Sequence, residues 1–260
     1  VVYFNCDNNL ELLNILKKEK TIDRIIEKLS LLSNEMIMIN DTLIIFDNIN
    51  DVDIVNGLRV FGKFDNGYHI IMITSLKENL NKFKGEEFHY KAMYPLDFEE
   101  YLIASGNNQL VEFIKTSFKN NTVMPFHSVA LEYFDDFVMT GGMPEAVSIK
   151  LQDKNTLLSM PVYDKVLDSY RKEIGMLNNL IDITRCNEVL DSIPFQLQKQ
   201  NRKFQYGLIK LGSRSKDYDK SISFLHNNGL AYKCYKISNV KSPLSSCKDM
   251  ESFKLYMSDT

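Results

Sequence analysis

The stretch that most constrains the fold is residues 41–75, which contains two short apolar runs separated by a helical pattern. The first run, residues 43–46, leads without a polar break into Asp47, and the second, residues 70–73, is soon followed by Ser75. Short apolar runs that end in polar residues and flank a helical pattern are typical of parallel strands covered on both faces. The stretch therefore predicts a β-α-β unit. Ligands of such sheets bind beyond the carboxyl ends of the strands, where Asp47 and Ser75 would lie.

The composition is that of a globular protein: 260 residues, 44% hydrophobic and 25% charged, enough for one large domain or two small ones. No apolar run approaches the roughly 18 residues of a membrane helix, and the first residues lack the pattern of a secretory signal. We therefore expect a cytoplasmic protein with no membrane span. The four cysteines and four histidines lack the paired spacing of zinc sites or disulfide frameworks. This favours reduced structural thiols and leaves a catalytic Cys-His pair open.

Positive charge is concentrated towards the C-terminal end of the sequence. Residues 199–241 contain ten lysines and arginines against two aspartates, a net charge of +8, which leaves −11 for the remainder. A basic segment attached to an acidic body indicates an anionic partner such as nucleic acid, although a solvated surface can have the same composition.

Apolar spacing predicts the other elements. Residues 1–4 predict a first strand and residues 88–93 a fourth one. Asp97, with Glu100 three residues later, predicts a capped helix start, and helical patterns dominate from residue 98. Helical spacing recurs around residues 12–16, 22–32, 54–61, 110–118 and 133–138, and over 162–181 as one long helix.

Beyond residue 194 the pattern changes to shorter elements. We expect helices around residues 195–200, 204–208 and 216–227, followed by a strand over 230–237. Three helices followed by a β-hairpin wing are the order of elements in a winged helix-turn-helix, and the segment coincides with the +8 region.

Asp47 is the first candidate for chemistry. P-loop NTPases place an acidic residue at the end of an apolar strand to hold Mg²⁺ on the phosphates, although strand-ending aspartates also serve as caps. Asn48 can orient a water molecule but cannot accept its proton. Ser75 is either a polar sensor of phosphate or a turn residue. Because the sequence contains no G-x-x-x-x-G-K-S/T motif, we do not expect this chain alone to bind ATP tightly.

Several stretches together resemble an AAA-type (P-loop) ATPase family of bacteria and archaea, and they occur in the order found in that family. They are residues 43–50 (LIIFDNIN), 73–76, 93–101, 140–146, 170–174, 201–206 and 253–259. Members of this family join an ATPase core to a winged helix and a nuclease-like C-terminal domain of unknown function. Where the family usually has Asp-Glu-Ile-Gln, this sequence has Asp-Asn-Ile-Asn at residues 47–50.

The resemblance implies an α/β fold: a partial parallel-sheet P-loop NTPase (AAA-like) core, followed by a helical lid and a winged-helix domain. The implied boundaries are 1–97 for the core, 98–193 for the lid, 194–252 for the winged helix and 253–260 for the start of a truncated C-terminal domain. It also implies that the P-loop lies upstream of residue 1 and that the cofactors are ATP and Mg²⁺.

The resemblance further implies roles for single residues. Asp47 would hold Mg²⁺ and the nucleotide, Asn48 would orient the attacking water, Ser75 would sense the γ-phosphate, and Arg171 would complete the site. In the alternative interpretation, the α/β part is a scaffold and the winged helix binds DNA or protein. The residues expected to contact DNA phosphates are Arg202, Lys203, Arg214, Lys216 and Lys220. An oligomer remains open in both interpretations.

Overall fold

The computed structural model describes residues 1–62, 66–75, 85–153, 159–177 and 179–258. The chain divides into two compact units, Val1–Lys91 with Phe224–Gly229, and Ala92–Ser223 with Leu230–Thr260. We refer to them as the first and the second unit. The division after residue 91 lies close to the change of pattern expected at residue 98, and the segments expected to form a lid and a winged helix lie mainly in the second unit.

The first unit contains a sheet of three parallel strands in the order β1-β2-β3. The strands are β1 (Val2–Asn5), β2 (Leu43–Asp47) and β3 (His69–Met72), and helix α3 (Val52–Gly62) connects the last two. The register pairs Val2 with Ile44 and Ile44 with Ile70. The predicted β-α-β unit is therefore confirmed.

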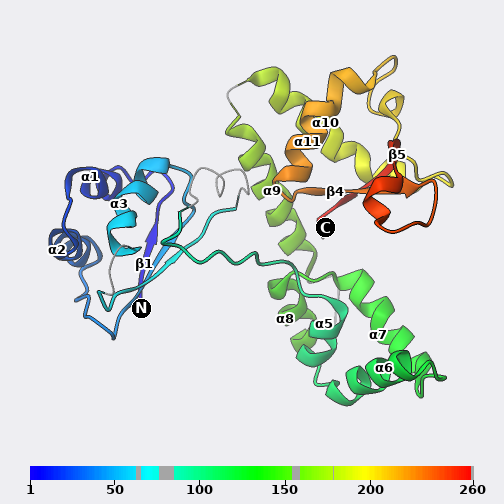
Figure 1. Ribbon diagram of the computed structural model, residues 1–260, viewed down its shortest axis with the longest axis horizontal. Helices are drawn as coiled ribbons and strands as arrows, with labels where there is room; N and C mark the ends of the chain where they lie inside the picture. The colour runs from blue at the N-terminus through cyan, green and yellow to red at the C-terminus, as the bar shows by residue number, and fades with distance from the viewer. Residues whose placement is uncertain (63–65, 76–84, 154–158, 178, 259–260) are drawn as a thin grey trace. The chain divides into compact units, whose positions relative to one another are not determined.

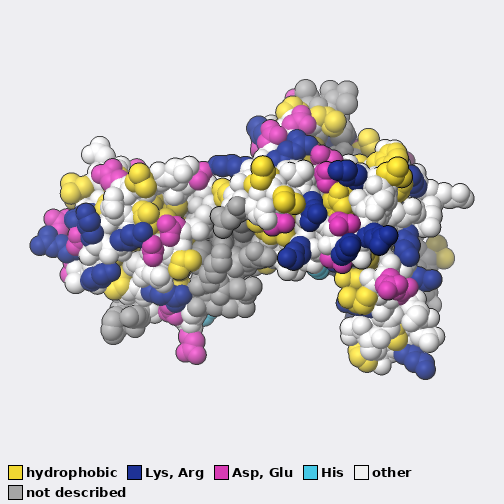
Figure 2. All heavy atoms as spheres, turned by 90° about the horizontal axis from the view of Figure 1, so that it is seen from above, with side chains coloured by type: hydrophobic (Ala, Val, Ile, Leu, Met, Phe, Trp, Pro, Cys, Tyr) yellow, Lys and Arg dark blue, Asp and Glu magenta, His cyan; other side chains and the backbone are white. Residues whose placement is uncertain are grey.

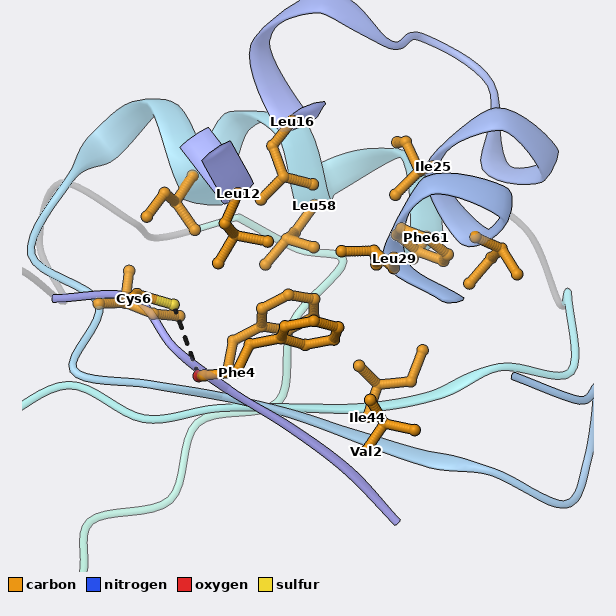
Figure 3. Packing of buried hydrophobic residues seen from close by; sticks show 14 of the residues in the cluster. Val2, Phe4, Cys6, Leu12, Leu16, Ile25, Leu29, Ile44, Leu58 and Phe61 are labelled. Carbon is orange, nitrogen blue, oxygen red and sulfur yellow. Dashed lines mark hydrogen bonds between the residues drawn. The ribbon is translucent and has the colours of Figure 1, made fainter. Parts of the chain in front are cut away.

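One face of this sheet packs against helices α1 (Leu10–Lys18), α2 (Ile22–Ser33) and α3 (Figure 3). At the centre, the rings of Phe4 and Phe46 stack with centroids 5.4 Å apart, and both side chains are buried. On the opposite face Tyr3 and Ile71 are 55% and 44% exposed. The expectation that both faces are covered is thus wrong for the described residues, because the strands alternate between a buried and an exposed side.

The second unit begins with four helices that pack together (Figure 1): α5 (Phe98–Ala104), α6 (Asn108–Asn120), α7 (His127–Thr140) and α8 (Pro144–Asp153). Asp97 and Glu100 form the predicted capping box at the start of α5. The ring of Phe98 lies against those of Phe134 and Phe137, at centroid distances of 5.2 and 5.7 Å. Helix α7 ends at Thr140, and Gly141 is its C-cap residue.

Four predictions for residues 88–208 differ from the structure. Residues 88–93 form no strand. The single helix expected over 162–181 is two helices, α9 (Met160–Gly175) and α10 (Leu180–Leu197), and the Asn179 side chain caps the second by accepting from the Ile181 N–H. Pro194 lies inside α10, so the first half of the helix expected at 195–200 is the end of α10, and residues 198–200 are not helical. The helix expected at 204–208 is one 3-10 turn, η2 (Tyr206–Leu208).

The last elements of the chain form a helix and a hairpin, and the division between the two units falls inside the helix, after Ser223. Helix α11 (Ser215–Asn227) and strand β4 (Ala231–Ile237) confirm the predicted helix and strand. After the short turn η3 (Leu244–Cys247), strand β5 (Lys248–Met257) pairs antiparallel with β4. The expected boundary at residue 253 therefore falls inside β5; residues 259–260 lie outside the described chain.

No helix among the described residues is both long and apolar enough to cross a bilayer.

Gly57 gives a test of how closely α1 and α3 approach. A Cβ atom at this position would lie 2.6 Å from both the Cβ and the carbonyl oxygen of Leu16. Alanine usually stabilises a helix interior by about 1 kcal/mol relative to glycine. Here we expect Gly57→Ala to destabilise the protein by roughly 1–3 kcal/mol, because a backbone atom cannot rotate away. Urea denaturation followed by circular dichroism measures the change.

The control is Gly175→Ala in α9, where a Cβ atom would meet no atom within 4 Å. This variant should be as stable as the wild type or slightly more stable. Equal stability of the two variants would contradict the close packing of α1 on α3.

Candidate functional site

The carboxyl ends of β2 and β3 lie at the same edge of the first unit's sheet. Beyond the strands the pairing continues, because the Ile73 N–H donates to the Phe46 carbonyl at 2.9 Å and the Ile49 N–H to the Ile73 carbonyl at 3.0 Å. Asp47 is the last residue of β2, and Ser75 follows two residues after Ile73. The structure thus brings Asp47 and Ser75 to one edge of the sheet.

The Asp47 carboxylate is held by two neutral donors. The Tyr3 hydroxyl donates to Oδ2 at 2.6 Å, and the Asn48 backbone N–H donates to Oδ1 at 2.8 Å. The Asp47 carbonyl also accepts from the Cys6 N–H at 2.8 Å. Each carboxylate oxygen has a second lone pair, so the group is oriented and can still accept a further hydrogen bond from water.

The carboxylate of Asp47 shapes the titration of its neighbours. The hydrogen bond from the Tyr3 hydroxyl to Asp47 raises the pKa of Tyr3, since ionisation would remove the donated proton. Burial, with the Asp47 charge as the smaller cause, raises the pKa of the Cys6 thiol to about 12. Cys6 is therefore a protonated structural thiol at neutral pH, as the sequence indicates for these cysteines.

Asn48 is exposed and has a left-handed backbone conformation, with φ of 57°. Its side-chain amide donates to the Asn5 Oδ1 at 3.3 Å, and the same oxygen accepts from the Asp7 N–H at 3.0 Å. Asparagine adopts this backbone region several times more often than most residues, so residue type and conformation agree here. The amide is thus placed beside Asp47 by the β1–α1 connection.

Ser75 is exposed, and the residue before it carries a second hydroxyl group that the sequence analysis did not single out. The Thr74 Oγ1 is buried and has no hydrogen-bond partner among the described residues. Buried hydroxyl groups in proteins nearly always have a partner, which can be water or a ligand. An unpartnered oxygen at the edge where Asp47 ends is compatible with a polar ligand at this place.

Arg171 lies in the second unit, on α9. Its guanidinium forms ion pairs with the Asp191 Oδ1 at 3.2 Å and the Asp168 Oδ1 at 3.9 Å, and its side chain is half exposed. The structure therefore gives Arg171 two carboxylate partners within its own unit.

The five predicted phosphate-contacting residues are exposed and fall in two groups. Arg202 and Lys203 precede Phe204, and Arg214 precedes α11, where Lys216 and Lys220 lie one turn apart. Figure 2 shows Lys and Arg side chains on the face of the chain that it draws. On α11 the exposed positions also include Asp219, which accepts from the Tyr206 hydroxyl at 2.7 Å. The exposed face of α11 is therefore only weakly basic.

A groove with a volume of about 540 Å³ lies on the hairpin of the second unit. It includes Lys203 from the predicted set and two lysines that the sequence analysis missed, Lys236 and Lys254. The pairing of β4 with β5 brings these side chains together, and no local sequence pattern indicates that pairing. Its lining residues are Asn201, Lys203, Cys234, Tyr235, Lys236, Ser252, Phe253 and Lys254.

Within the described chain, no group of three or more His, Cys, Asp or Glu side chains is arranged to hold a metal ion. Asp47 is a single oxygen donor that can contact Mg²⁺ through water, and Mg²⁺ in nucleotide sites takes its other ligands mainly from phosphates and water. Asp47 at the sheet edge therefore fits as the carboxylate that a protein contributes to a Mg²⁺-nucleotide site. The contacts described above for this edge include no lysine or arginine that could bind the phosphates.

A family described as a domain of unknown function, DUF8612, matches residues 131–260. This match covers half of the chain. The chain belongs to the DUF8612 family. The DUF8612 region begins inside α7 and includes α8 to β5, and thus the groove, Arg171 and the five predicted basic residues. Asp47, Asn48 and Ser75 lie outside it. A comparison with curated proteins finds no match.

The contact between Tyr3 and Asp47 can be tested by titration. Replacing Asp47 with alanine removes the acceptor, so the pKa of Tyr3 should fall towards the ordinary value of 10.0. In the wild type, the raised pKa means that this hydrogen bond is intact below pH 10 and is lost as the pH rises through the higher folded-state value. A pH titration of tyrosine ring carbons by NMR, with Tyr3→Phe to assign the signal, measures the change.

Asp41→Ala is the control, because Asp41 is an exposed carboxylate of the same unit with no side-chain contact to Tyr3. The Tyr3 titration should be unchanged in this variant. If the pKa of Tyr3 were also unchanged in Asp47→Ala, the Tyr3 hydroxyl would not be hydrogen-bonded to Asp47 in solution.

Proposed function

We propose that the first unit supplies the acidic and sensor side of a Mg²⁺-ATP site in an AAA-type ATP-binding protein. The observation that carries the proposal is the meeting of Asp47, Asn48 and Ser75 at the carboxyl edge of a parallel sheet, where nucleotides bind in such folds. Two observations support it: the Tyr3 hydroxyl orients Asp47, and the Thr74 hydroxyl has no hydrogen-bond partner within the part of the chain that the structure describes.

Each residue has a defined task in this proposal. Asp47 accepts a hydrogen bond from a water on the metal, and bound Mg²⁺ neutralises charge on the phosphates. Ser75 donates to a phosphate oxygen or to water. Asn48 can orient a water through its amide, but an amide cannot take a proton, so this chain lacks the usual base at this position. Hydrolysis should be slow or absent.

In this proposal the phosphate-binding side of the site is supplied by residues other than these 260, because the sequence has no P-loop motif. Arg171 is left out of the proposed site, since its guanidinium pairs with Asp191 and Asp168 within the second unit.

The proposal is tested by calorimetry with Mg²⁺-ATP on a protein that carries a P-loop segment upstream of this sequence. We expect binding by the extended protein and none by the 260-residue chain. Asp47→Ala in the extended protein should weaken binding at least about tenfold, or 1.4 kcal/mol, because the metal loses its acidic partner. Asp41→Ala should bind as the wild type does. An extended protein that does not bind Mg²⁺-ATP would refute the proposal.

A second candidate function is nucleic-acid binding by residues 194–252, arranged as a winged helix. The net charge of +8 over residues 199–241 favours it. The order α10, η2, α11, β4 and β5 also matches helices followed by a hairpin wing, with the second helix reduced to a 3-10 turn. The backbone at Phe204 adds a third segment beside β5, since its N–H donates to the Phe253 carbonyl at 2.8 Å.

This second function predicts a strong dependence on salt. If Arg202, Lys203, Arg214, Lys216 and Lys220 each contact a phosphate of duplex DNA, the logarithm of the binding constant should fall with the logarithm of salt concentration. The expected slope is about −4 to −5, because each contact releases counterions. Fluorescence anisotropy over a salt series measures the slope, and a flat dependence would exclude this mode of binding.

A further inference from the structure

The groove of the second unit is built by three chain segments that lie side by side. Strand β4 pairs with β5 so that Cys234 faces Lys254 and Tyr235 faces Phe253 across the ladder. On the other side of β5, the Phe204 N–H donates to the Phe253 carbonyl, and the two rings stack at 5.5 Å with an angle of 15° between their planes. This contact holds the preceding residues 201–203 along β5 and places them at the groove.

The lining of the groove is basic and contains no acidic residue. Lys203, Lys236 and Lys254 come from the three different segments. Among the described residues, no carboxylate lies within 4 Å of the amino group of any of these three lysines. Three ammonium groups around one groove repel each other, and an anion in the groove would relieve that repulsion. Asn201 and Ser252 add neutral donors.

Two further lysines add positive charge next to the groove. The amino group of Lys233 lies 5.2 Å from the ring centroid of Phe253, and that of Lys248 lies 5.4 Å from that of Tyr235. These cation–π contacts cover aromatic faces that would otherwise be open for stacking. The groove therefore offers positive charge and hydrogen-bond donors. We expect it to contact the phosphate backbone of a nucleic acid and not its bases.

We propose that this groove binds the phosphate backbone of a nucleic-acid strand, with Lys203, Lys236 and Lys254 as its contacts. This proposal rests on the second candidate function, nucleic-acid binding. It differs in the contact surface, which is the β4–β5 hairpin and not α11. A polyanion fits better than a single small anion because the positive charge continues beyond the groove at Arg202, which stands between the lining residues Asn201 and Lys203, and at Lys233 and Lys248. Lysine binds a phosphate as a point charge, which suits a groove that holds a backbone without reading its bases.

Matched double variants locate the binding surface. Lys236→Gln with Lys254→Gln removes two charges from the groove, and Lys216→Gln with Lys220→Gln removes two from the exposed face of α11. Anisotropy with a fluorescein-labelled single-stranded oligonucleotide measures affinity at several salt concentrations. We expect the groove variant to bind at least about tenfold more weakly, with a salt slope shallower by about 1.4, and the α11 variant to bind within about threefold of the wild type.

Cys234 provides an independent measurement inside the groove. It is exposed, whereas Cys6 and Cys186 are buried, so in a Cys247→Ser background Cys234 is the thiol that should react first with a maleimide. We expect the oligonucleotide to slow this reaction at least about fivefold at low salt and to have little effect at high salt. Poly-glutamate of similar length serves as the comparison polyanion and should not protect Cys234.

Each other outcome counts against a specific statement. If the wild type does not bind the oligonucleotide at low salt, both the groove site and the second candidate function are wrong. If the α11 variant loses binding and the groove variant does not, nucleic-acid binding stands and the groove site is wrong. If poly-glutamate protects Cys234 as well as the oligonucleotide does, the groove accepts acidic protein segments, and the assignment to nucleic acid is wrong.

Discussion

The parallel pairing of β1 with β2 and of β2 with β3 brings three carboxyl ends to one edge of the first unit's sheet. This pairing requires at least one face to be buried, and Phe4 and Phe46 meet that requirement by stacking beneath α1, α2 and α3. Because the register pairs Asn5 with Asp47, β1 also delivers Tyr3 and Asn5 to the surroundings of Asp47. The candidate nucleotide site is thus a consequence of the strand register.

The sequence predicts the strands and most helices of the first unit because their apolar patterns are local. It does not predict Tyr3 as a partner of Asp47, since that contact depends on which strands pair and in which register. The break between α9 and α10 was missed because apolar residues continue at helical spacing through it, although Asn179 is a recognisable cap residue. The strand expected at 88–93 shows that an apolar run needs a pairing partner as well as a pattern.

The basic region illustrates a different limit of sequence analysis. Charge counting locates the +8 segment correctly but cannot say which lysines share a surface. Lys216 and Lys220 are one turn apart on α11, yet Asp219 lies among the same exposed positions. Lys236 and Lys254 are far apart in sequence and meet only through the β4–β5 ladder. The set of lysines at the groove is therefore one that only the tertiary structure brings together.

The left-handed backbone of Asn48 has a consequence for the chemistry of the proposed nucleotide site. With φ at 57°, the position suits asparagine, whereas a residue with a longer side chain pays about 1 kcal/mol to adopt the same conformation. A glutamate here would provide a group able to take a proton from water, but it would adopt less readily the conformation that directs the backbone N–H of residue 48 to the Asp47 carboxylate. At residue 48, the backbone conformation at the end of β2 favours asparagine, whereas proton transfer from water would require a residue such as glutamate.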